Sequence, residues 1–111
     1  MSISARLLLT AALLALSPNG AGAAPPFNCS IAAEPAEIAI CDSADLSLLD
    51  REMNRLYIDK RKALKAEGKL DVAEALRLDQ RAFLKIRNEC GYEMTCLTGL
   101  YKKRNELLGK P

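Results

Sequence analysis

Apolar residues recur every three or four positions over most of the chain after residue 43, which is the spacing of an amphipathic helix. Three such series predict three helices, over about residues 44–67, 70–89 and 95–108. Each series forms one seam: Leu46, Leu49, Met53, Tyr57 and Leu64 in the first, Leu76, Gln80, Phe83, Arg87 and Cys90 in the second, and Leu97, Tyr101, Arg104 and Leu108 in the third. Gly68, Gly91 and Gly109 stand where these helices are expected to end.

A shorter helix is predicted ahead of these three. Pro35 suits a first helical turn, which gives a helix over about residues 35–41. Asp42 and Ser43 then offer N-caps for the next helix. No stretch alternates with the period of a strand. The pattern therefore predicts an all-α fold, a small disulfide-stapled bundle of three helices plus a short N-terminal helix.

The first 23 residues follow a different pattern. Arg6 precedes an apolar run over residues 7–16, and small, turn-prone residues follow over 17–23. This is the layout of a secretory signal peptide, and the run is shorter than the roughly 20 residues of a membrane span. Ala21 and Ala23 fit the cleavage rule. We expect cleavage after Ala23 and one mature domain, residues 24–111, that is periplasmic or secreted and has no membrane anchor.

The charge balance and the absence of one residue type narrow the function. Residues 24–111 carry 15 Lys and Arg against 14 Asp and Glu, a balance that does not favour a nucleic-acid partner. The chain has no histidine, which removes His-based catalytic triads and His-containing zinc sites. Paired catalytic carboxylates are also missing. We therefore expect no catalytic residue, no metal, no cofactor and no enzymatic activity.

Four cysteines lie in the predicted mature segment: Cys29, Cys41, Cys90 and Cys96. Eleven residues separate the first two and five separate the last two, so neither pair has the spacing of a zinc site or a redox C-x-x-C. Export to an oxidising compartment favours disulfides. Four cysteines allow three pairings, of which we expect the two local ones, Cys29–Cys41 and Cys90–Cys96, at about 2–3 kcal/mol each.

Polar side chains interrupt the apolar seams. Asp50 is in register with the first seam, and Gln80, Arg87 and Arg104 fall on the other two. Because buried charges need partners, we expect an internal network that fixes helix register, with Asp50 paired to Arg87 or to Arg104. The alternative is that these residues edge the core and reach solvent. Tyr101, on the third seam, is expected to be half-buried.

Three blocks of this sequence resemble the LprI-type lysozyme inhibitor N-terminal domain, also called YecT-like. They are ICDSADLSLLDREMNRLY (40–57), LRLDQRAFLKIRNEC (76–90) and CLTGLYKKRNELL (96–108). The positions that match the family pattern are Cys41, Leu46, Leu49, Asp50, Asn54, Tyr57, Gln80, Arg81, Leu84, Arg87, Cys90, Cys96, Leu97, Tyr101 and Arg104. Phe83 stands where the family pattern has Trp, and residues 62–75 match no part of it. The resemblance covers nearly all of the expected mature domain.

The resemblance implies a protein partner, and in its sharpest form a lysozyme whose muramidase activity is blocked. The alternative is an envelope structural or stress-related protein with a different protein partner. Animal-type lysozymes are strongly basic, and the net charge of this chain gives no steering toward them. The cysteine-bounded loop 91–95 is the first candidate for partner binding, through Tyr92 and Glu93. The loop 66–69, with Glu67, is the second.

Overall fold

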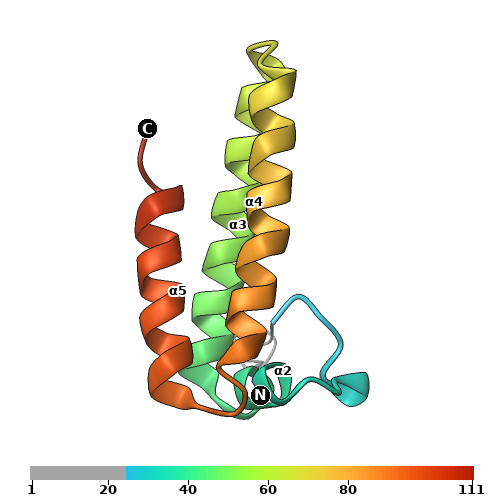
Figure 1. Cartoon of the computed structure of the whole chain (residues 1–111), viewed down its shortest axis with the longest axis vertical. Helices are drawn as coiled ribbons and strands as arrows, with labels where there is room; N and C mark the ends of the chain where they lie inside the picture. Colours follow the sequence, from blue (N-terminus) through green and yellow to red (C-terminus); the bar gives the residue numbers. More distant parts are fainter. Residues whose placement is uncertain (1–24) are drawn as a thin grey trace, which may run out of the picture.

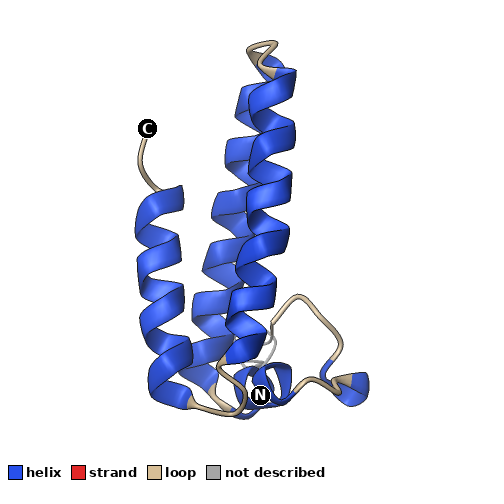
Figure 2. Ribbon diagram, in the orientation of Figure 1, coloured by secondary structure: helices blue, strands red, loops and turns tan. Residues whose placement is uncertain are grey.

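The computed structural model describes residues 25–111, so the expected signal peptide and its cleavage site lie outside the described residues. The elements are a 3-10 turn η2 (Cys29–Ile31) and the helices α2 (Pro35–Asp42), α3 (Ala44–Ala66), α4 (Leu70–Glu89) and α5 (Met94–Leu108) (Figure 1). Residues 25–111 contain no strand (Figure 2). The predicted all-α bundle is confirmed, and the observed helix ends lie within one residue of the predicted ones.

The helices form a tall hairpin with shorter elements packed around its lower half. α3 and α4 run antiparallel and rise together, while α2 lies across the bottom of both (Figure 1). α5 returns along the lower part of the hairpin and packs chiefly against α3. Because α5 has 15 residues against 23 in α3, it ends well short of the hairpin tip.

Local sequence sets where the helices begin and end. Ser43 caps α3, since its hydroxyl accepts a hydrogen bond from the Leu46 amide at 3.1 Å. Gly68 and Gly91 adopt positive φ angles of 76° and 58° just after α3 and α4. Glycine adopts such angles without a steric penalty, so these two glycines favour the chain reversals that follow α3 and α4.

The core fills the lower half of the bundle. It consists of buried side chains from all four α-helices: Ala36, Ala39, Ile40, Leu46, Met53, Phe83, Leu97, Tyr101 and Leu108. The Phe83 and Tyr101 rings meet edge to face, with their centroids 5.7 Å apart. Phe83 therefore fills the position of the family tryptophan with an aromatic contact that does not use an indole N–H.

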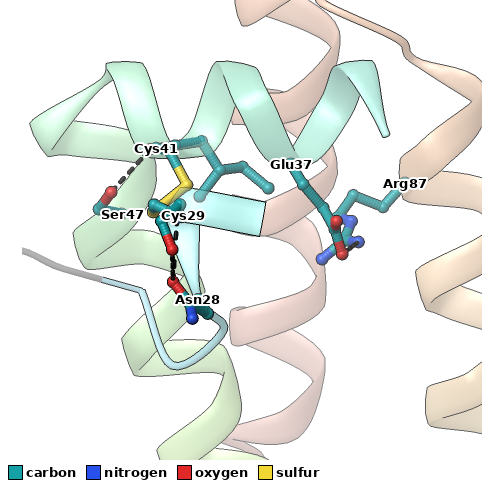
Figure 3. The surroundings of a disulfide bond; sticks show 8 residues. Asn28, Cys29, Glu37, Cys41, Ser47 and Arg87 are labelled. Carbon is teal, nitrogen blue, oxygen red and sulfur yellow. Dashed lines mark hydrogen bonds and ion pairs between the residues drawn. A yellow bond between two sulfur atoms is a disulfide. The ribbon is translucent and has the colours of Figure 1, made fainter. Parts of the chain in front are cut away.

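One polar residue from each of the four α-helices joins a connected set of polar contacts, of which all but the partly exposed Glu37 are buried in this core. Tyr101 of α5 donates a hydrogen bond to Oδ1 of Asp50 in α3 at 2.6 Å. Arg87 of α4 lies 3.8 Å from the same oxygen and 3.5 Å from Oε2 of Glu37 in α2 (Figure 3). We call this set, Glu37, Asp50, Arg87 and Tyr101, the four-helix polar chain. These contacts link all four helices, and they include Asp50 and Arg87 of the expected network.

The other two predicted network residues form a separate cluster. Arg104 donates to Oε1 of Gln80 at 2.8 Å and to Oδ2 of Asp79 at 2.5 Å. Of the two partners predicted for Asp50, Arg87 is thus the observed one and Arg104 is wrong. The prediction for Tyr101 is also wrong, because its side chain is fully buried. The sequence reasoning missed Glu37, although Ala36, Ala39 and Ile40 beside it on α2 are core residues.

The Asp50 carboxyl lies in an unusual environment. Its side chain is 2% exposed, and its Oδ2 atom has no hydrogen-bond partner among the described residues. Burial raises the pKa of Asp50, against the opposing effects of the Tyr101 hydrogen bond and the Arg87 charge. Burial and the neighbouring Asp50 charge raise the pKa of Tyr101, so its phenol stays protonated and keeps donating.

Tyr101→Phe keeps the ring contacts and removes the hydroxyl that satisfies Asp50. We expect the free energy of unfolding to fall by about 1–3 kcal/mol, because a buried carboxylate loses a hydrogen bond. Urea unfolding measures this directly. The matched control is Tyr57→Phe, because Tyr57 is half-buried and does not belong to the four-helix polar chain. This substitution should change the free energy of unfolding by less than about 0.5 kcal/mol. Equal effects of the two substitutions would contradict the role given to the Tyr101 hydroxyl.

Asp50→Asn removes the titration of the buried carboxyl. Since the pKa of Asp50 is higher in the folded protein than the unfolded value of about 3.9, its contribution to stability is full below that value and declines as pH rises. The stability of wild type minus that of the variant should therefore decrease from acid toward neutral pH. Urea unfolding of both proteins at each pH cancels most other titrating groups. A difference that increases with pH would mean that the folded pKa is lowered.

Candidate protein-binding surface

Both disulfides lie at the lower end of the bundle. Cys29–Cys41 joins η2 to the last turn of α2, with Cα atoms 5.8 Å apart (Figure 3). Cys90–Cys96 closes the turn between α4 and α5, with Cα atoms 5.7 Å apart. The predicted local pairings are confirmed, and no cysteine of the described chain is free. We call this end of the bundle, built from residues 25–50 and 88–101, the foot.

Hydrogen bonds reinforce the disulfides within the foot. The Ser47 hydroxyl donates to the Ile40 carbonyl at 2.7 Å and fixes α2 on α3 (Figure 3). Asn28 accepts at 2.9 Å from the amide of Ser30 and so caps η2. With these contacts the foot holds one shape, although it contains most of the irregular backbone between residues 25 and 111.

The loop between Cys90 and Cys96 is also held by a hydrogen bond to α2. Tyr92, whose side chain is 52% exposed, donates its hydroxyl to Oδ2 of Asp42 at 2.9 Å. This hydrogen bond to a carboxylate raises the pKa of Tyr92. Glu93 is the N-cap of α5 and accepts from the Thr95 amide at 3.0 Å. Tyr92 is therefore exposed to solvent while its hydroxyl is hydrogen-bonded to Asp42. Glu93 caps α5 in addition to carrying a negative charge.

Glu67, the other predicted contact residue, lies at the opposite end of the molecule. It sits at the tip of the α3–α4 hairpin and forms an exposed ion pair with Lys69 at 3.1 Å. Residues 51–66 of α3 separate it from the foot by about 25 Å at 1.5 Å per residue. The structure brings Tyr92 and Glu93 together and excludes Glu67 from any small site that contains them. Each of the two locations stays a prediction.

The charges of the chain are unevenly distributed along the sequence, although Arg87 contacts Glu37 and Asp50 of the foot, and Arg51 and Lys102 border it. The foot holds seven Asp and Glu and no Lys or Arg, whereas the other described residues hold all 15 Lys and Arg and the remaining seven acids. These formal charges of −7 and +8 explain the nearly neutral total. Five of the foot carboxylates are exposed: Glu34, Asp42, Asp45, Glu89 and Glu93. The sequence did contain this signal, since residues 25–50 and 88–101 lack any cation, but a total net charge conceals it.

Exposed apolar side chains accompany the acids of the foot. Ile31 on η2 is 76% exposed, and Ile38 on α2, Tyr92 and Met94 are also exposed. An aromatic or aliphatic side chain on rigid backbone, surrounded by charges, is the usual composition of a protein–protein contact surface. The foot therefore combines exposed acids with exposed apolar side chains.

Residues 25–111 contain no group of three or more potential metal ligands. Within the same range, none of the helices combines the length and hydrophobicity needed to cross a bilayer.

Comparison with known proteins identifies the family. The sequence model of the family described as "Lysozyme inhibitor LprI" matches residues 29–108, from the first cysteine to the end of α5. No curated protein and no solved structure matches the chain. The match spans both disulfides, the four-helix polar chain and the whole hairpin, including residues 62–75. By this match over most of its length, the chain belongs to the LprI lysozyme inhibitor family.

Proposed function

We propose that this protein is an exported inhibitor of a basic lysozyme and that it binds the enzyme through the foot. Family membership carries the functional part of the proposal. The expected signal peptide and the two disulfides support action outside the cytoplasm. The division of charge supports the choice of surface, since five exposed carboxylates stand on the foot with no cation among residues 25–50 and 88–101.

Electrostatic attraction gives the foot a specific role in encounter. A cluster of carboxylates raises the association rate with a basic partner and orients the approach, and the effect weakens as salt screens it. The +8 charge of the remaining described residues repels the same partner. In this proposal a basic enzyme approaches the acidic foot first, a preference that the nearly neutral total charge does not indicate.

Preorganisation supports the loop 91–95 as the central contact. Its ends are joined by a disulfide, its tyrosine is held by Asp42, and its Glu93 is fixed by the α5 amide. Little conformational entropy remains to be lost when such a loop binds. In this arrangement Tyr92 supplies apolar contact area, and the surrounding acids meet cations at the rim of the enzyme's cleft.

Neutralising the foot should weaken inhibition and its salt dependence together. The foot variant carries Glu34→Gln, Asp45→Asn, Glu89→Gln and Glu93→Gln. Glutamine at 93 keeps an oxygen that can accept from Thr95, so α5 stays capped. We expect the inhibition constant to rise at least about tenfold at low ionic strength, with a smaller rise at high salt. The measurement is a muramidase assay with c-type, g-type and i-type lysozymes on a cell-wall substrate.

The matched control removes four carboxylates outside the foot. It carries Asp59→Asn, Glu67→Gln, Asp71→Asn and Glu106→Gln. Inhibition by this variant should equal that of the wild type or exceed it. Loss of inhibition in the control alone would place the site at the hairpin tip with Glu67. Absence of inhibition of every lysozyme by the folded, oxidised wild type would overturn the function and leave an envelope protein with another partner.

Tyr92→Ala should raise the inhibition constant about tenfold or more, because it removes an exposed aromatic anchor from the centre of the contact. Tyr92→Phe keeps the ring and removes only the hydrogen bond to Asp42, so we expect a smaller loss. Thermal unfolding of both variants checks that the fold survives. Inhibition by Tyr92→Ala at wild-type strength would exclude Tyr92 from the contact, even if the charge variant behaves as expected.

A further inference from the structure

The upper half of the α3–α4 hairpin has an open apolar groove that the proposed function does not use. The groove begins where α5 ends and runs toward the hairpin tip, with a volume of about 970 Å³. Its apolar lining includes Leu56, Ala63 and Leu64 of α3 and Val72, Ala75 and Leu76 of α4. Figure 1 shows the hairpin standing above the end of α5 on this side. The groove lies at the opposite end of the molecule from the foot.

The groove continues the same helical seam that α5 covers lower down. On α3 the positions Leu49, Met53, Leu56, Lys60 and Ala63 follow a 4-3-4-3 spacing. Leu49, Met53 and Leu56 belong to the core that contains the apolar residues of α5. Lys60 marks the boundary, because its ammonium group donates to the carbonyls of Leu108 and Lys110 at 3.5 and 2.8 Å. Ala63 lies past that boundary, on a seam shaped to receive a helix.

The rim of the groove is balanced in charge. Its acids are Asp59, Glu67 and Asp79, and its cations are Arg55, Lys60, Lys69 and Lys110. The cations Arg61, Lys62 and Lys65 of the same hairpin do not line it. A strongly charged partner therefore gains nothing here, whereas a surface with the same mixture of signs can match it.

We propose that a second copy of the chain occupies this groove, with the two hairpins packed face to face and antiparallel as a four-helix bundle. Two-fold symmetry then places each α3 on the partner's α3 and each α4 on the partner's α4. The tip of one hairpin lies beside the α5 end of the other. Glu67 approaches the partner's Lys60, and Lys69 approaches the partner's Asp79, so unlike charges meet at both edges.

Small residues lie where the two copies come closest. Ala63 and Ala75 are exposed and fall near the middle of the groove, so each would meet its own counterpart across the two-fold axis. Small side chains there let helices approach closely while Leu56, Leu64 and Leu76 interdigitate around them. The overlap is only a few helical turns long, which is less than a standard interface of about 800 Å² per partner. The dimer is therefore a weak one that forms at high micromolar concentration or above.

The test is sedimentation velocity of the oxidised mature protein from dilute solution to millimolar concentration. We expect reversible association of the wild type to a dimer. Ala63→Arg places two like charges at the two-fold axis and should weaken dimerisation at least about tenfold. Ala66→Arg makes the same change one turn on, at an exposed position that does not line the groove, and should associate as the wild type does. Both changes preserve helix propensity at exposed sites, so folding should be unaffected.

Small-angle scattering of the associated sample tests the arrangement itself. Overlap through the hairpin tips gives a particle much longer than the monomer, whereas side-by-side packing does not. Three results would each overturn the proposal. They are a wild type that stays monomeric at every concentration, an Ala63→Arg variant that associates as strongly as the wild type, and a dimer no longer than the monomer. A monomer whose lysozyme inhibition is abolished by Ala63→Arg would place the enzyme in the groove instead. The foot variants test lysozyme binding separately, so the two proposals fail independently.

Discussion

The arrangement of this protein depends on one buried ion pair with its hydroxyl partner, Asp50 and Arg87 with Tyr101. Each comes from a different helix, and Glu37 of α2 extends the set to the fourth. Apolar packing alone tolerates rotation and sliding of helices, because any face of suitable size can fill the core. A buried carboxylate and guanidinium do not tolerate such movement, since separating the two leaves each charge buried without a partner. The four-helix polar chain thus sets the register in which α2 crosses the bundle.

That register determines the shape of the foot. With α2 held at Glu37, the next turn brings Cys41 to Cys29 and Asp42 to Tyr92. The Cys90–Cys96 disulfide then holds the other side of the same surface. This order has an energetic cost, because burial of Asp50 opposes the charge that Arg87 stabilises and raises the pKa of the carboxyl. A small domain can bear that cost since two disulfides restrict its unfolded state.

The sequence was sufficient for the fold and insufficient for the surfaces. Helix ends, caps and disulfides followed from periodicity, from Gly68 and Gly91, and from cysteine spacing, because those signals are local. The partner of Asp50 could not be chosen, since Arg87 and Arg104 occupy equivalent seam positions and only the packing of α5 separates them. Glu37 was missed because its contact with Arg87 depends on how α2 crosses the bundle, which the local sequence does not indicate. Tyr92 and Glu93 were found from loop composition, but their hydrogen bonds to distant or backbone atoms depend on the folded foot.

The open groove originates in the mismatch between a long hairpin and a short α5. The foot collects α2, both disulfides and the start of α5, all from segments without cations. Residues 51–87 carry most of the lysines and arginines, and the upper half of the hairpin has a seam that no helix of the described chain covers. If two copies meet through that seam in antiparallel fashion, their acidic feet point to opposite ends and neither is obstructed. Such a dimer would carry two independent lysozyme-binding surfaces, whose spacing is fixed by helix length and not by a flexible linker.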